Sequence, residues 1–184
     1  MQAIGKRLAF YLAVSALYAF VCATIMGLVA ASVLGPGWGL RVALEVGLTP
    51  LVVIFLAGCI HCVTVSALPF GVSDETLAVR HVRTVRLDVP LEEAFSRCKS
   101  ALGLVRRHRI RKQDLSGGVL VARTGMTWKS WGDIIRFTLR QDGGGLTVVE
   151  VSSRPLLPTT IVDQGENLQI VEKISASLRA STGT

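Results

Sequence analysis

The sequence predicts an α+β protein in two parts: a two-helix transmembrane hairpin, then a cytoplasmic β-α-β-β-β-β-α domain with an antiparallel sheet. The first observation is uneven charge, because residues 1–72 hold four of the chain's 33 Lys, Arg, Asp and Glu side chains. The second is composition: the 184-residue chain is 50% hydrophobic yet has a net charge of +7. The third is that strand and helix periodicities alternate after residue 78. These properties exclude a secreted disulfide scaffold, a disordered chain and a conventional soluble enzyme.

Two apolar stretches predict the hairpin. No charge interrupts residues 8–34, which suffice for one tilted span because a span needs about 20 apolar residues. The Gly- and Pro-rich segment 35–39 predicts a break, and a second span is expected over about 45–70. The predicted organisation is therefore a transmembrane hairpin over 1–72, a linker over 73–78 and an α+β domain over 79–184.

The positions of the basic residues predict the orientation. Lys6 and Arg7 precede the first span and further arginines follow the second, whereas the connection carries only Arg41. The positive-inside rule then predicts a multi-pass protein of a bacterial inner membrane with both termini in the cytoplasm. A cleaved signal peptide is the alternative, but its apolar region is usually about 7–15 residues long.

Small residues recur every four positions in the first span. In lipid, helices associate where small side chains let their backbones approach closely. This ridge is expected to pack partly within the hairpin and partly against another protein. Its members are Ser15, Ala19, Ala23, Gly27 and Ala31.

The second span contains an ionisable residue, His61, between Cys59 and Cys62. An ionisable side chain inside a membrane is a functional hypothesis by default. One helix cannot direct all three side chains to one metal, although Cys22 of the first span offers a further ligand. His61 alone is a candidate axial ligand for haem or chlorophyll, and Ala57-x-x-x-His61 resembles the ligand motif of light-harvesting helices. The alternative is a neutral histidine hydrogen-bonded within the helix interface, with the cysteines as apolar packing residues.

The rest of the chain predicts the domain's elements in order. Strand alternation begins at Val85, and Pro90 stands where a helix with Glu92 and Glu93 in its first turn can begin. Both helices are expected to bury their apolar stripes on one face of the sheet. The expected elements are strands at 85–89, 107–113, 119–123, 133–141 and 146–152, and helices at 91–102 and about 164–178.

The second expected strand of the domain overlaps a basic run over residues 106–112. The cationic residues of this run are Arg106, Arg107, Arg109, Arg111 and Lys112. On a regular strand Arg107, Arg109 and Arg111 share one face, and Lys112 lies on the other with His108 and Ile110. Anionic lipid headgroups are the nearest polyanion for a tethered domain, and each cation near them contributes about 1 kcal/mol. RNA is disfavoured because no aromatic residue interleaves with the run. A solvated edge strand protected by charge is the remaining interpretation.

Two tryptophans and two acids form a second group of candidates. The segment 127–133 holds Trp128 and Trp131, which could stack on a ligand, lie at a membrane interface or close the end of the sheet. Asp163 with Glu166 fits a capping box. Asp133 and Asp163 resemble a carboxylate pair, but a turn and a helix cap account for them, so catalysis is not predicted.

Three short motifs in a fixed order carry a resemblance. Trp131-Gly-Asp133, a strand hairpin ending at Val151-Ser-Ser153, and Asp163-x-Gly-x-Asn167 follow one another. In this order they resemble small bacterial domains of unknown function with Trp-Gly-(Asp/Glu) and Asp-x-Gly-x-Asn motifs. The resemblance spans about 123–178 and has Gln164 where tryptophan or leucine is expected. It implies an α+β domain and no known activity.

Enzyme motifs are absent from the sequence: it has no phosphate-binding loop, nucleophile elbow, zinc-protease motif or dinucleotide fingerprint. The leading prediction is a non-enzymatic accessory or assembly subunit of a larger inner-membrane complex. A membrane-tethered module that binds or senses anionic lipid is the first alternative. A haem, chlorophyll or metal carrier acting through His61 is the second. The predicted partners are membrane lipids and other membrane subunits, and no cofactor is assigned.

Overall fold

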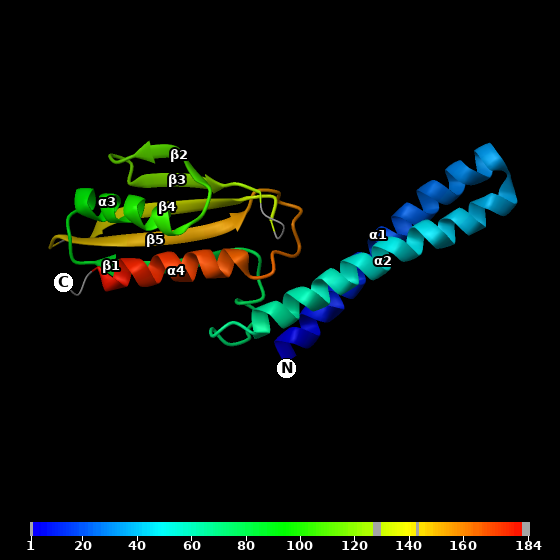
Figure 1. Cartoon of the computed structure of the whole chain (residues 1–184), viewed down its shortest axis with the longest axis horizontal. Helices are drawn as coiled ribbons and strands as arrows, with labels where there is room; N and C mark the ends of the chain where they lie inside the picture. Colours follow the sequence, from blue (N-terminus) through cyan, green and yellow to red (C-terminus); the bar gives the residue numbers. More distant parts are fainter. Residues whose placement is uncertain (1, 127–129, 143, 182–184) are drawn as a thin grey trace. The chain divides into compact units, whose positions relative to one another are not determined.

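The computed structural model describes residues 2–126, 130–142 and 144–181, and the chain forms two compact units (Figure 1). The first unit is Met1–Leu77 and the second is Ala78–Thr184. Their boundary falls within the predicted linker 73–78.

Two long helices build the first unit: α1 (Gln2–Leu34) and α2 (Pro36–Ser66). Only Gly35 separates them, with a φ of 102° that favours glycine. Proline suits the first position of a helix, so Pro36 opens α2 instead of extending the break. The expected connection over 35–39 is therefore too long, and Arg41 lies within α2. The second helix also ends at Ser66, earlier than the predicted 70.

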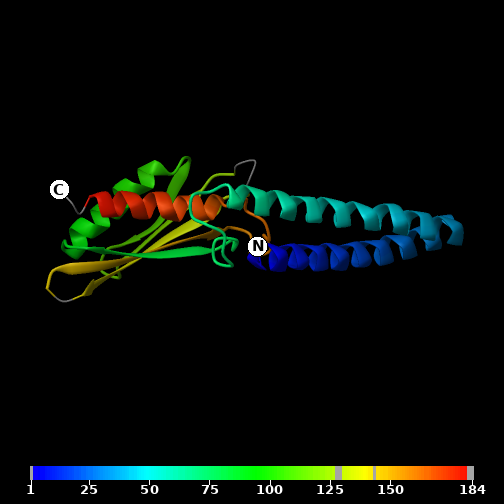
Figure 2. The same ribbon diagram turned by 90° about the horizontal axis from the view of Figure 1, so that it is seen from below.

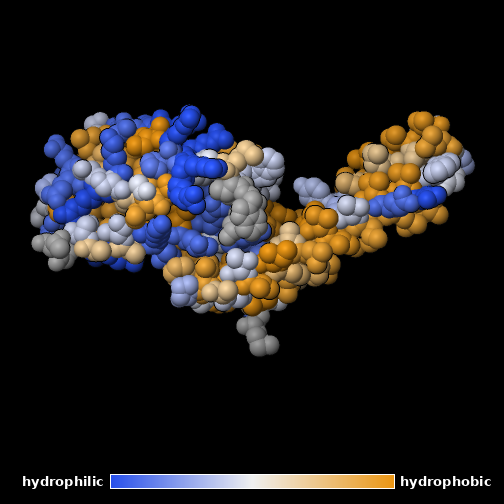
Figure 3. Space-filling view, viewed as in Figure 1, coloured by the Kyte–Doolittle hydropathy of each residue, from blue (hydrophilic) through white to orange (hydrophobic). Residues whose placement is uncertain are grey.

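On the side seen in Figure 3, the surface of this helix pair is mostly apolar. Large side chains point outward from α1, including Phe20 at 70% exposure and Val33 at 74%. Both helices are long and apolar enough to cross a membrane. A helix that is hydrophobic all round must be covered by protein or lipid.

The second unit is a five-stranded antiparallel sheet with two helices, as the sequence predicts. The sheet order is β1-β5-β4-β3-β2, so the first strand pairs with the last. In chain order the elements are β1 (His81–Leu87), α3 (Leu91–Ala101), the 3-10 turn η1 (Leu102–Leu104), β2 (His108–Asp114), β3 (Val119–Thr124), β4 (Asp133–Asp142), β5 (Leu146–Pro155) and α4 (Glu166–Ala180).

Both helices cover the same face of the sheet (Figure 2). One hydrophobic core joins Phe95 of α3 and Ile174 of α4 to Phe137 and Val151 of the sheet. Alternation explains this: along β4 and β5 every second residue is buried. Among the described residues of the second unit, no helix covers the other face of the sheet. The core lies wholly within the second unit, so we expect this domain to fold by itself.

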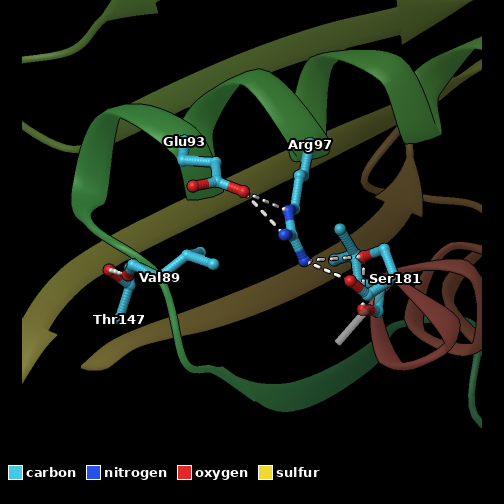
Figure 4. A network of polar contacts seen from close by, with 6 residues as sticks. Val89, Glu93, Arg97, Thr147 and Ser181 are labelled. Atoms are coloured by element: carbon cyan, nitrogen blue, oxygen red, sulfur yellow. Dashed lines mark hydrogen bonds and ion pairs between the residues drawn. The ribbon is translucent and has the colours of Figure 1, made fainter. Parts of the chain in front are cut away.

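Polar contacts fasten α3 to its neighbours (Figure 4). Arg97 donates to the Glu93 carboxylate at 2.6 Å within α3, and its other nitrogen donates to the carbonyl oxygen of Ser181, just after α4. At the start of the helix, the Thr147 hydroxyl donates to the carbonyl oxygen of Val89 at 2.8 Å. These contacts fix the helices over the sheet and leave its open face unobstructed.

A register shift in β2 corrects one prediction. Arg109 lies opposite Arg123 of β3, but the pairing shifts between Ile110 and Lys112, so Lys112 lies opposite Val121. Arg123 and Val121 are two residues apart on one strand and share a face. Lys112 therefore lies on the same face as Arg109, not on the opposite one. The physical reason is the bulge, which places one extra residue, Arg111, in β2.

Candidate functional site

The open face of the sheet gathers cations from every strand. Its row nearest the start of β4 runs across four strands, with Arg154 opposite Ile134, Ile134 opposite Arg123, and Arg123 opposite Arg109. We call this surface the basic sheet face. Its cationic members are Arg86, Arg109, Lys112, Arg123, Arg136, Arg140 and Arg154, and the strand acids on the same face are Asp114, Asp142 and Glu150.

A pocket lies where the basic sheet face meets the start of β2 and the end of β3. Its volume is about 620 Å³, and Thr124, Gly125, Met126 and His108 complete its lining. Four arginines line it: Arg107, Arg109, Arg111 and Arg123, which we call the arginine pocket. No acidic partner of these four is found among the described residues.

The fold therefore brings only part of the basic run to the arginine pocket. Arg107 precedes β2 with a φ of 53°, so it is not part of the strand, contrary to the prediction. It nevertheless lines the pocket with Arg109 and Arg111, whereas Arg106 does not. Lys112 forms an ion pair with Asp114 at 3.4 Å instead.

Behind the same end of the sheet lies a buried network, the polar cluster, formed by Thr124, Ser130, Asp133, Ser153, Asp163 and Asn167. Asn167 is its centre: its amide nitrogen donates to Asp133 at 3.0 Å and to Asp163 at 3.1 Å. Its amide oxygen accepts from the Ser153 hydroxyl. The motif residues Asp133, Ser153, Asp163 and Asn167 thus meet in space.

The two acids of the polar cluster have structural partners. Asp133 accepts from Ser130 at 3.0 Å and from Thr124 at 3.3 Å. Burial raises the pKa of Asp133, while these hydrogen bonds and that from Asn167 lower it in part. The nearby Asp163 raises the Asp133 pKa further.

The carboxylate of Asp163 binds the start of α4 as predicted, but Asp163 is not the cap residue of the helix. The helix α4 begins at Glu166, with Gly165 as its cap residue. Asp163 lies one turn earlier and accepts from the backbone N–H groups of Gly165 at 3.1 Å and Asn167 at 3.2 Å. The left-handed conformation of Gly165 turns the chain so that the carboxylate reaches both donors.

The small-residue ridge lies against α2 within the helix pair. A Cβ built on Gly27 would lie 2.9 Å from Ala43, and one on Gly39 would lie 2.8 Å from Ala31. Likewise, a Cβ on Gly47 would lie 3.0 Å from Ala23 and 3.4 Å from the Ala19 carbonyl oxygen. Ser15 is buried as well, and its hydroxyl donates to the carbonyl oxygen of Leu12.

His61 is buried beside Tyr11 of α1. The two rings meet edge to face, with their centroids 6.1 Å apart. Gly58 allows this approach, because a Cβ built on Gly58 would lie 2.4 Å from the Tyr11 ring. The His61 Nε2 atom lies 3.2 Å from the Leu77 carbonyl oxygen. Among the described residues, no three His, Cys, Asp or Glu side chains are grouped to hold a metal. In this arrangement Nε2 is within hydrogen-bond distance of a backbone carbonyl oxygen.

Sequence reasoning overlooked two features of this end of the sheet. Arg123 and Arg154 belong to the basic sheet face, but only the strand register reveals it. The sequence does not single out Thr124, and it places Ser153 in a motif without an assigned contact. Of the tryptophan segment 127–133, Trp128 lies outside the described residues, and Trp131 is 63% exposed.

Comparison with known proteins finds only distant structural similarity. No family model and no curated protein matches it. The crystal structure of Ara h 8.0201 aligns with 56% of this chain and 96% of its own, at 12% identity and a TM-score of 0.37. The di-domain ARO/CYC BexL from the BE-7585A biosynthetic pathway aligns with 80% of this chain and 57% of its own, at 15% identity and a TM-score of 0.29. Both scores are low, so the function is inferred from the chain's own residues.

Proposed function

We propose that the chain is a non-enzymatic protein of a bacterial inner membrane whose cytoplasmic domain binds anionic lipid headgroups. The helix pair α1 and α2 is its anchor, with both termini in the cytoplasm. The observation that carries the proposal is the basic sheet face. Arg109, Arg123 and Arg154 stand in one row on a face that no helix of the domain covers.

Electrostatics favour lipid as the partner of this face. Like charges directly opposite each other on a sheet are destabilising, and Arg109 faces Arg123 without an acid between them. An anionic surface relieves that repulsion and gains about 1 kcal/mol for each cation near it. A domain held beside a membrane by α2 meets such a surface before any other polyanion.

The test is binding of residues 78–184 to vesicles with and without phosphatidylglycerol. Replacing Arg109, Arg123 and Arg154 by alanine is expected to weaken binding about 100-fold, from about 3 kcal/mol in total. The matched control removes the same charge from the helices, through Lys99→Ala, Lys173→Ala and Arg179→Ala. Equal losses in the two triple variants would mean that net charge, not this face, drives binding. A vesicle affinity that does not fall as the salt concentration rises would contradict the proposal altogether.

A second candidate function is the accessory or assembly subunit of a larger complex. It is favoured by one charged pair on an apolar helix, Arg41 and Glu45 of α2, which are 3.0 Å apart and about two-thirds exposed. Charged side chains on a membrane helix are costly unless they meet a polar partner. Arg41 also lies 5.5 Å from the centre of the Trp38 ring.

The accessory role is tested by blue-native electrophoresis after mild solubilisation. A larger complex that is lost in Glu45→Leu but kept in Glu75→Leu would support it, since Glu75 lies outside both helices. Recovery of only the free protein or a homo-oligomer would count against it.

A further inference from the structure

The end of the domain beside the arginine pocket exposes apolar side chains. Met126 is 58% exposed, Trp131 is 63% exposed and Leu157 is 42% exposed. We call these three residues the apolar rim. Large apolar side chains usually lie in the core of a domain. A group of them that is exposed together indicates a surface that contacts a membrane or another molecule.

Backbone contacts hold together the two loops that carry the apolar rim. The Leu156 N–H donates to the Gly132 carbonyl oxygen at 2.9 Å. A Cβ built on Gly132 would lie 2.9 Å from the Thr124 carbonyl oxygen, so only glycine permits this close approach. The rim residues are sequence neighbours of these contact points, and they come from two separate loops.

The apolar rim adjoins the arginine pocket. Met126 itself lines the pocket together with Arg107 and Arg123. The Gly125 N–H donates to the Arg107 carbonyl oxygen at 2.9 Å, which holds the start of one loop against the base of the pocket. Cations and apolar side chains therefore stand next to each other, with the tryptophan suited to the headgroup level of a bilayer.

The chain enters the domain at this same end. His81, the first residue of β1, lies opposite Ser153, two residues before the end of β5. Thr124, Asp133 and His81 are thus at one end of the sheet. The segment that leaves α2 joins the domain at the end that carries the pocket and the rim.

We propose that this end of the domain is a membrane-docking site: the arginine pocket takes a phosphate-bearing lipid headgroup while the apolar rim enters the interface. This inference rests on the proposed lipid-binding function and assigns it a ligand class. Guanidinium groups form paired hydrogen bonds to phosphate oxygens, and a phosphomonoester offers more oxygens and more charge than a phosphodiester. The four arginines of the pocket, for which the described part of the chain offers no acidic partner, fit such a group.

The experiment uses the full chain in nanodiscs, with Trp38→Phe and Trp128→Phe leaving Trp131 as the single tryptophan. Its fluorescence is measured with lipids brominated along their chains and with acrylamide in the water. We expect bromine quenching in discs with phosphatidic acid, weaker quenching with phosphatidylglycerol at equal charge, and little with phosphatidylcholine. The double variant Arg109→Ala and Arg123→Ala is expected to lower the docked-to-free ratio about thirtyfold. The matched control, Lys99→Ala with Arg179→Ala, removes the same charge from exposed helix positions outside the basic sheet face and is expected to leave the ratio unchanged.

Each other outcome is decisive. If detergent-solubilised chain binds inorganic phosphate as tightly as lipid discs and Trp131 stays exposed, the pocket serves a free phosphate and membrane docking is wrong. If Trp131 is shielded from acrylamide without bromine quenching, a protein covers the rim instead. If anionic vesicles still bind the domain but Trp131 stays open to acrylamide, this inference fails while the proposed function stands. If anionic lipid has no effect on the domain in any assay, both fail.

Discussion

Replacing Asn167 by alanine tests whether the polar cluster holds this end of the domain together. The change removes the two donated hydrogen bonds, at 3.0 Å to Asp133 and 3.1 Å to Asp163, and the one accepted from Ser153. A hydrogen bond to a charged group contributes about 1.5–3 kcal/mol, and a buried group that loses its partner adds a desolvation cost. We therefore expect the free energy of unfolding to fall by about 3–5 kcal/mol.

The assay is urea unfolding of residues 78–184 followed by far-UV circular dichroism. With a slope near 2 kcal/mol/M, a loss of about 4 kcal/mol lowers the midpoint by about 2 M. Gln169→Ala is the matched control, because it removes an amide from the same helix at an exposed position. That control is expected to stay within about 0.5 kcal/mol of the parent. A loss below about 1 kcal/mol for Asn167→Ala, at an unchanged slope, would refute the assignment of the cluster as a structural lock.

Three further predictions follow from buried positions. Gly58→Leu is expected to lower the melting temperature of the full chain in detergent by several degrees, because its Cβ would lie 2.4 Å from Tyr11, whereas Gly37→Leu, with open space, should not; equal melting of the two variants would contradict this packing. Burial raises the pKa of Cys98 to about 12, so iodoacetamide should modify this thiol slowly at mildly alkaline pH and rapidly in urea, as followed by mass spectrometry. Rapid labelling of Cys98 in the folded chain would count against this prediction. Asp133 has a raised pKa, so the stability that its protonated form contributes at low pH is lost as the pH rises through that pKa. The unfolding free energy of Asp133→Asn minus that of the parent should therefore increase with pH over this window. A difference in unfolding free energy that does not change with pH would show that burial does not govern the carboxyl.

The order of elements could be predicted because local signals agree with the final packing. Pro90 with Glu92 and Glu93 marks the start of α3, which begins at Leu91. Alternation along β4 and β5 likewise reproduces which residues the core buries. In these strands alternate side chains face the core, so the two-residue period of apolar residues in the sequence matches the burial in the structure.

The functional surface could not be predicted in the same way, because it depends on register. Arg109, Arg123 and Arg154 are far apart in the sequence and meet only through strand pairing. The bulge at Arg111 was equally invisible, since the basic run alternates as regularly as an unbroken strand would. Side chains on β3, which pair with β2, determine where the extra residue falls.

The pairing of β1 with β5 has a consequence for synthesis of the chain. At the edge of the sheet β1 has β5 as its single neighbour, so it has no strand partner until residues 147–153 have been made. By then both apolar helices have already left the ribosome. The domain thus closes late, around a contact of long sequence separation, and such contacts slow folding. During that interval the unpaired edge of β1, with its Arg83 and Arg86, depends on charge to keep it from pairing with other chains.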